Sequence, residues 1–74
     1  MIKIYQFETC PFCKKVKDFM DKNNIEYEKV EVDRDNKPEI VLSTGGTVPV
    51  IDDDGVIVPD SSKIIEYLKK KYNL

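Results

Sequence analysis

The sequence contains no histidine and no tryptophan, and only two cysteines among its 74 residues. Without histidine, no Ser-His-Asp triad can be assembled. No apolar run approaches the roughly 20 residues that span a bilayer, and the alternating start of the chain lacks the apolar stretch of a signal peptide. We therefore expect a cytoplasmic protein that makes no membrane contact.

Size and charge restrict the class of protein further. The chain has 35% charged and 41% hydrophobic residues and a net charge of −2, a balance typical of a folded, soluble domain. Because nucleic-acid binding normally needs a clear basic excess, we expect no nucleic-acid partner. The length is near the lower limit for one self-sufficient core, so we predict a single domain over residues 1–74. We also expect a monomer.

The first half of the chain predicts a strand, a helix and a second strand. Residues 2–7 alternate with period two, and residues 26–32 form a similar β-branched and aromatic stretch. Between them, Pro11 opens a helix that ends at Asn23-Asn24. We expect four side chains at helical spacing to face the core: Phe12, Val16, Phe19 and Met20. The right-handed crossover rule makes the two strands parallel.

The second half predicts a short helix, a hairpin and a last helix. The short helix runs from about Lys37 to Ser43. Two apolar runs, 48–51 and 56–58, flank Asp52-Asp53-Asp54-Gly55, which we interpret as a solvated hairpin turn, since it lacks the spaced ligands of a calcium loop. The last helix begins around residues 59–62, and its apolar stripe is Ile64, Ile65, Leu68 and Tyr72.

The two cysteines lie where the first strand passes into the first helix. A thiolate at Cys10 would be stabilised by the N–H groups and dipole of the helix start, so its pKa should fall below about 8.5. We expect Cys10 to attack a substrate disulfide and Cys13, one turn later, to resolve the mixed disulfide. Three nearby lysines could add positive potential at the cysteines, but we expect them to form a solvated face, where exposed charges are screened: Lys14, Lys15 and Lys17. Two alternatives stay open, a pair of buried small apolar residues and a zinc half-site shared between two chains.

Three motifs together resemble the glutaredoxin family: Cys10-Pro11-Phe12-Cys13 after a strand, Thr47-Val48-Pro49, and Asp60-Ser61 at the start of the last helix. The resemblance covers the whole chain. It implies an α/β, thioredoxin-like fold, with a four-stranded mixed sheet flanked by three helices in the order β-α-β-α-β-β-α. Residues 48–68 also resemble the N-terminal domain of glutathione transferases.

The resemblance also implies how the motifs bind substrate. Pro49 should be cis and lie next to the cysteines, and the backbone of Val48 should pair antiparallel with a bound thiol peptide. Asp60 and Ser61 have two open interpretations, a helix N-cap and a site for the γ-glutamyl carboxylate of glutathione. The substrate-binding residues expected on this basis are Pro11, Phe12, Thr47, Val48, Pro49, Asp60 and Ser61.

The chain departs from the glutaredoxin pattern near the site. Many glutaredoxins have basic residues at the positions of Phe7 and Gly46, and Pro59-Asp60 replaces their paired glycines. Lys37 could supply part of the missing positive charge. These departures leave the reducing partner open.

The leading hypothesis is a dithiol–disulfide oxidoreductase that holds no bound cofactor or metal. It would reduce disulfide-containing proteins or glutathione mixed disulfides, with glutathione as co-substrate. One alternative is an electron donor fed by a thioredoxin-reductase-like system, which Phe7 and Gly46 favour. The other is a metal or iron–sulfur-bridging module in which Cys10 residues of two chains share a cluster.

Overall fold

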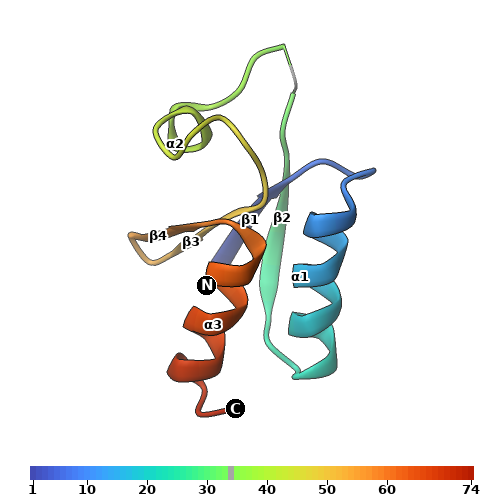
Figure 1. Ribbon diagram of the computed structural model, residues 1–74, viewed down its shortest axis with the longest axis vertical. Helices are drawn as coiled ribbons and strands as arrows, with labels where there is room; N and C mark the ends of the chain where they lie inside the picture. The colour runs from blue at the N-terminus through green and yellow to red at the C-terminus, as the bar shows by residue number, and fades with distance from the viewer. Residues whose placement is uncertain (34) are drawn as a thin grey trace.

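The computed structural model describes residues 1–33 and 35–74. It contains β1 (Ile2–Gln6), α1 (Pro11–Lys22), β2 (Tyr27–Glu31), α2 (Glu39–Leu42), β3 (Val50–Asp53), β4 (Val56–Pro59) and α3 (Ser61–Lys71) (Figure 1). This order and the thioredoxin-like α/β class confirm the sequence prediction. No helix in these two ranges is long and apolar enough to cross a bilayer.

The sheet is mixed, with the strand order β2-β1-β3-β4. β1 runs parallel to β2, as the crossover rule predicts, whereas β3 is antiparallel to both β1 and β4. Tyr5 pairs with Val50, and Val50 pairs with Pro59. The end of β1, the start of β3 and the end of β4 therefore meet at one end of the sheet, which we call the cysteine end. The opposite end, where Ile2 pairs with Asp53, is the far end.

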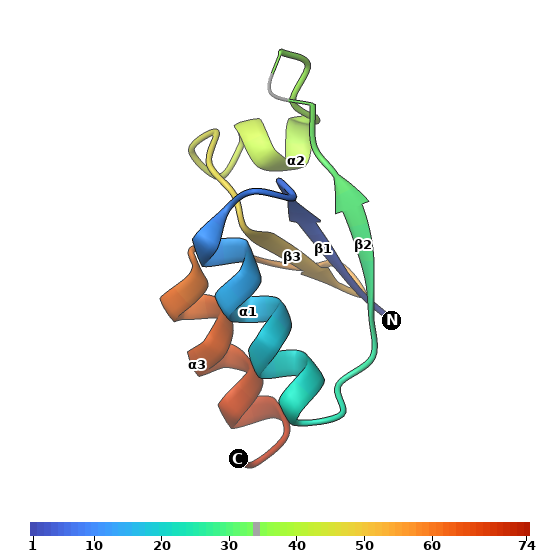
Figure 2. The same ribbon diagram turned by 90° about the vertical axis from the view of Figure 1, so that its right-hand side faces the viewer.

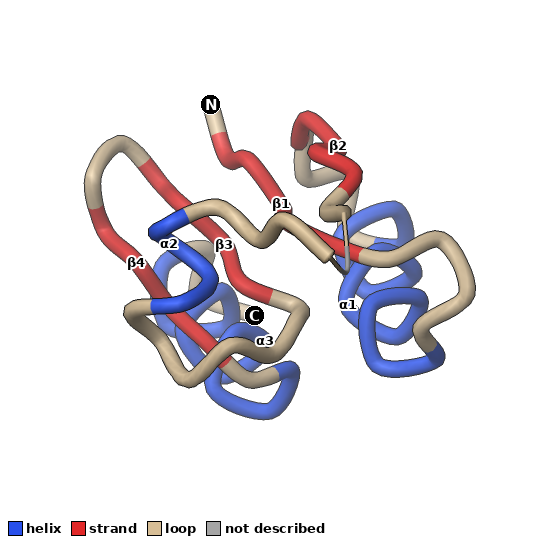
Figure 3. The backbone as a smooth tube through the Cα atoms, turned by 90° about the horizontal axis from the view of Figure 1, so that it is seen from above, coloured by secondary structure: helices blue, strands red, loops and turns tan. Residues whose placement is uncertain are grey.

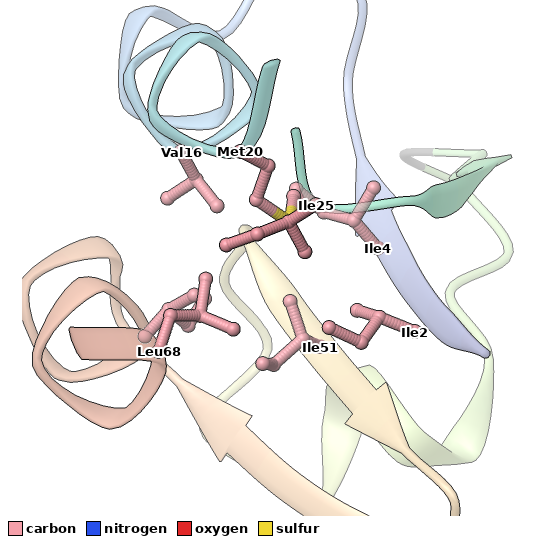
Figure 4. Close-up of a cluster of buried hydrophobic side chains, with 8 residues drawn as sticks. Ile2, Ile4, Val16, Met20, Ile25, Ile51 and Leu68 are labelled. Atoms are coloured by element: carbon pink, nitrogen blue, oxygen red, sulfur yellow. The ribbon is translucent and has the colours of Figure 1, made fainter. Parts of the chain in front are cut away.

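Helices α1 and α3 lie side by side against one face of the sheet (Figures 2 and 3). The short α2 lies apart from them, beyond the cysteine end (Figure 1). The core forms between the helix pair and the sheet (Figure 4), and its buried side chains are Ile2, Ile4, Val16, Met20, Ile25, Ile51, Ile64 and Leu68. The alternation along β1 therefore sends Ile2 and Ile4 toward the helices.

Two aromatic residues expected in the core lie outside it. Phe12 is 60% exposed, because the inward face of α1 begins one residue later with Cys13 and continues through Val16 and Met20. Tyr72 is 43% exposed and follows the last residue of α3, so it no longer shares the buried stripe of that helix.

The acidic segment before Gly55 also differs from the prediction. Asp52 and Asp53 belong to β3, and only Asp54-Gly55 forms the turn, with positive φ at both residues. Asp53 is 5% exposed rather than solvated. It is buried because two side chains of α3, Tyr67 and Lys71, donate hydrogen bonds to its carboxylate.

Candidate active site

Cys10 occupies the N-cap of α1. A turn closed by a hydrogen bond from the Cys10 N–H to the Phe7 carbonyl (3.2 Å) brings the chain from β1 to the helix. Cys10 is extended (φ −84°, ψ 119°), Pro11 is the first helical residue, and no side-chain hydrogen bond caps the helix. A negatively charged sulfur at Cys10 therefore lies where a capping oxygen normally accepts from the first-turn N–H groups, which favours the thiolate.

Cys13 is entirely buried, whereas Cys10 is partly exposed, and no disulfide joins them. Burial, followed by a hydrogen bond to Cys10, raises the pKa of the Cys13 thiol to about 12. The backbone of Phe7 and the charge of Lys17 act in the opposite direction. Cys13 consequently remains a protonated thiol at neutral pH, and its S–H donates toward Cys10. This inequality matches the predicted division between an attacking and a resolving cysteine.

The loop before β3 reaches the cysteine end of the sheet. The Val48–Pro49 peptide bond is cis, as the resemblance implies. Pro49 is buried, Val48 is half-buried and Thr47 is exposed. Val50 pairs with Tyr5, so Pro49, the residue before Val50, lies near the end of β1, from which the cysteine loop departs.

Lys37 anchors this loop from the preceding segment. Its Nζ donates to the carbonyl of Gly46 at 2.7 Å. Gly46 has φ +77°, a conformation that would strain any residue with a Cβ. The basic side chain that many glutaredoxins carry at this position is therefore disfavoured here, and Lys37 places a cation next to it instead.

Asp60 caps the last helix. Its carboxylate accepts from the Ser62 N–H at 3.0 Å, which confirms the N-cap interpretation. Its own N–H donates to the Pro49 carbonyl at 3.3 Å and so ties the start of α3 to the cis-proline loop. Asp60 has φ +72°, a region that few residues other than glycine adopt. Ser61, the first helical residue, is buried.

A groove of about 400 Å³ gathers six of the predicted substrate-binding residues. Its lining combines apolar side chains with the capped start of α3, and Asp60 is its one ionisable residue. The groove is lined by Phe12, Thr47, Val48, Pro49, Asp60, Ser61 and Ser62. Phe12 is the second residue of α1 and so connects this groove to the helix that begins after Cys10, although neither cysteine lines the groove.

A polar cluster on the other side of the cysteine loop was missed by the sequence prediction. Lys17 was expected on a solvated face, but it is half-buried and donates to the side chain of Gln6. Gln6 in turn donates to Glu8 and Glu31. The one feature of the sequence that indicates this cluster is Gln6, a polar residue on the same face of the alternating strand as Ile2 and Ile4.

The chain matches the family described as Glutathione S-transferase, N-terminal domain, over residues 4–74. It belongs to this family. The resemblance noted for residues 48–68 thus extends over nearly the whole chain. The glutaredoxin resemblance is confirmed as well, by an uncharacterized glutaredoxin-like 8.6 kDa protein in rubredoxin operon from Clostridium pasteurianum. That protein is 42% identical over 66 residues, which cover 85% of this chain and 88% of the relative.

Larger proteins carry the same glutathione S-transferase N-terminal domain. The chloroplastic glutathione S-transferase DHAR3 of Arabidopsis thaliana is 45% identical over 65 residues, which are 85% of this chain but 25% of that protein. The crystal structure of rice GST1 in complex with glutathione superposes with a TM-score of 0.91 at 25% identity, and the match covers 97% of this chain and 34% of the rice chain. The chain therefore spans only about a quarter to a third of these two relatives.

Proposed function

We propose that this chain is a glutaredoxin-like thiol–disulfide oxidoreductase in which Cys10 attacks and Cys13 resolves. The observation that carries the proposal is the unequal pair of thiols at the start of α1. One is partly exposed at the helix N-cap and the other is completely buried one turn later. The glutaredoxin-like relative and the glutathione S-transferase N-terminal domain family support the same class of chemistry.

The reaction consists of two thiol–disulfide exchanges. The Cys10 thiolate attacks one sulfur of a substrate disulfide, an S–S bond forms to Cys10, and the other substrate sulfur leaves as a thiolate that takes up a proton. Cys13 then loses its proton and attacks the Cys10 sulfur. The Cys10–Cys13 disulfide forms and the second substrate thiolate leaves. The two cysteines are oxidised, and the substrate disulfide is reduced by two electrons.

Glutathione fits the groove as the co-substrate. Its γ-glutamyl end carries a carboxylate and an ammonium group on one carbon. The start of α3 with Ser61 suits the carboxylate, and the Asp60 carboxylate suits the ammonium. An extended thiol peptide could pair with the backbone of Val48, and Lys37, whose Nζ is bound to the Gly46 carbonyl of this loop, provides a cation to attract a second carboxylate.

Turnover with a defined substrate tests this function. We expect the chain to reduce a mixed disulfide between glutathione and a small thiol when glutathione and its reductase are supplied. Cys10→Ser should abolish turnover, whereas Cys13→Ser should still form a mixed disulfide that mass spectrometry detects. Absence of turnover on both glutathione and protein disulfides would contradict the proposal.

Phe7 and Gly46 favour a second candidate, an electron donor fed by a thioredoxin-reductase-type enzyme. Neither Phe7 nor Gly46 carries a positive charge that would attract the glycine carboxylate of glutathione. A parallel assay with such a reductase in place of glutathione separates the two candidates. Rapid turnover with glutathione alone would exclude the second one.

A further inference from the structure

The side chain of Gln6 lies at the centre of a charged cluster at the cysteine end of the sheet. Gln6 is the last residue of β1 and is completely buried. Its Oε1 accepts a hydrogen bond from Lys17 Nζ at 2.6 Å. Its Nε2 donates to Glu8 Oε1 and to Glu31 Oε2, each at 3.1 Å. One neutral amide thus separates a lysine from two carboxylates.

This arrangement leaves the charge of Lys17 without a direct counter-ion. Within residues 1–33 and 35–74, no carboxylate oxygen lies within 4.0 Å of Lys17 Nζ. One turn earlier on α1, the exposed Lys14 pairs directly with Asp18 at 2.6 Å. The charge of a half-buried cation that is bound to a neutral amide is not compensated by a carboxylate, so it interacts more strongly with other nearby groups.

Besides Glu8, on which this charge also acts, the field of Lys17 reaches Cys13. It lies one turn before Lys17 on α1, it is completely buried, and the charge of Lys17 acts on its thiol. The charged groups around this end come from three segments, namely Cys10 and Lys17 from α1, Glu8 from the loop after β1, and Glu31 with Lys29 from β2. Glu8 and Glu31 accept hydrogen bonds from the Nε2 of Gln6, whereas Lys17 donates to its Oε1, so the lysine and the two carboxylates contact different atoms of the amide.

We propose that Lys17, held in place by Gln6, stabilises the negative charge on the Cys13 sulfur during the resolving step. The proposal rests on the function proposed above, since it assigns a role within the second exchange. In that step Cys13 gives its proton to solvent, its thiolate attacks the Cys10 sulfur, and the Cys10–substrate bond breaks with its electron pair on the leaving thiolate. Lys17 acts through Cys13 and touches no substrate, so it is a positioning residue.

The charge of Lys17 has its largest effect on Cys13 once Cys10 is joined to the substrate in the mixed disulfide. While Cys10 is a thiolate, its charge and its hydrogen bond from Cys13 both hold the Cys13 proton in place. Once Cys10 is joined to the substrate, its sulfur is neutral and both of these effects are lost. The field of Lys17 remains, and it now favours loss of the proton at the step where the thiolate is needed.

A coloured aromatic disulfide, dithionitrobenzoate, separates the two exchanges in time. With the protein in excess, the attack by Cys10 releases one nitrothiolate at a rate that rises with protein concentration. The attack by Cys13 releases the second nitrothiolate at a rate that is independent of protein concentration. Stopped-flow absorbance therefore measures each cysteine in the same trace, and the pH dependence of the second phase follows deprotonation of Cys13.

Lys17→Gln, which keeps a donor near Gln6 but removes the charge, should slow the second phase about threefold near neutral pH. An increase of about one unit in the Cys13 pKa would lower the thiolate fraction about tenfold, and the greater nucleophilicity of the more basic thiolate recovers about threefold of that loss. The pH midpoint of the second phase should likewise rise by about one unit. Lys17→Met should do the same, and Lys17→Arg should restore both values. Lys15→Met, which removes an exposed cation of the same helix, is the matched control and should change neither phase.

Three outcomes would overturn the inference or its basis. A second phase that is unchanged in Lys17→Gln and Lys17→Met would contradict the role of Lys17 while leaving the oxidoreductase function intact. A slower second phase with an unmoved pH midpoint and no rescue by Lys17→Arg would also contradict it and assign Lys17 a structural role. If the unmodified chain showed no second phase at all, the proposed function itself would fail.

Discussion

The two ends of the sheet bury polar groups in opposite ways. At the far end, the buried carboxylate of Asp53 accepts hydrogen bonds directly from Tyr67 and Lys71. At the cysteine end, a buried neutral amide keeps Lys17 apart from Glu8 and Glu31. In a direct ion pair the two charges compensate each other, and loss of either partner leaves the other buried and uncompensated. An amide bridge positions a cation and leaves its field available to a reacting sulfur.

The largest effect on stability is expected from breaking the far-end group. Asp53→Ala removes the acceptor of two side chains in α3, and we expect the free energy of unfolding to fall by about 2 kcal/mol. Denaturant unfolding measures this loss. Asp54→Asn is the matched control, because Asp54 is exposed, its one ion pair among the described residues is with the N-terminus, and asparagine tolerates its positive φ, so its effect should stay below about 0.5 kcal/mol. Equal losses in the two variants would contradict the contrast between these residues.

The same group should give the far end a marked acid sensitivity. Hydrogen bonds from Lys71 and then Tyr67 lower the pKa of Asp53 below its ordinary value of 3.8. A carboxyl with a lowered folded-state pKa contributes stability above 3.8, and this contribution is lost as the pH falls from there through the folded-state value. Asp53→Asn should therefore show a flatter fall in unfolding free energy across that acid range. An identical slope in the variant would show that Asp53 is not the group responsible.

A single substitution can give the cysteine end a direct ion pair like that of the far end. Gln6→Glu would let Lys17 form a direct ion pair and would place a third carboxylate beside Glu8 and Glu31. We expect the second nitrothiolate release to slow about threefold and its pH midpoint to rise, because the cation is neutralised. The first release should change little. An unchanged midpoint would show that the neutral amide has no special role.

The smallest stability effect is expected at the exposed aromatic of the groove. Phe12 is 60% exposed, so Phe12→Ala should change the unfolding free energy by less than about 0.5 kcal/mol. Its contact area lies on the groove, so KM for a glutathione mixed disulfide should rise about two- to fivefold while kcat is kept. Unaltered KM would remove Phe12 from the substrate-binding residues.

The sequence predicted the order of elements because strong local signals agree with the tertiary structure. Alternation along β1, Pro11 at the helix start and Asp60 before the last helix each specify one structure, and all three are confirmed. The cis bond before Pro49 could be expected only from the family resemblance, since most X–Pro bonds are trans.

What the sequence did not reveal depends on long-range partners. Asp53 was assigned to a solvated turn because its burial depends on Tyr67 and Lys71, which are 14 and 18 residues further along the chain. Lys17 was assigned to solvent because its acceptor, Gln6, belongs to another element. Phe12 was placed in the core because helical spacing alone does not fix which neighbouring position faces inward.

The pH dependence of alkylation in Cys13→Ser measures whether Cys10 is an activated thiolate. Only Cys10 can react in this variant, and its rate with iodoacetamide follows its thiolate fraction. We expect a midpoint well below the ordinary thiol value of about 8.5, together with a Cys10→Ser variant whose buried Cys13 hardly reacts at neutral pH. A Cys10 midpoint at or above about 8.5, or faster alkylation of Cys13 than of Cys10, would contradict this expectation.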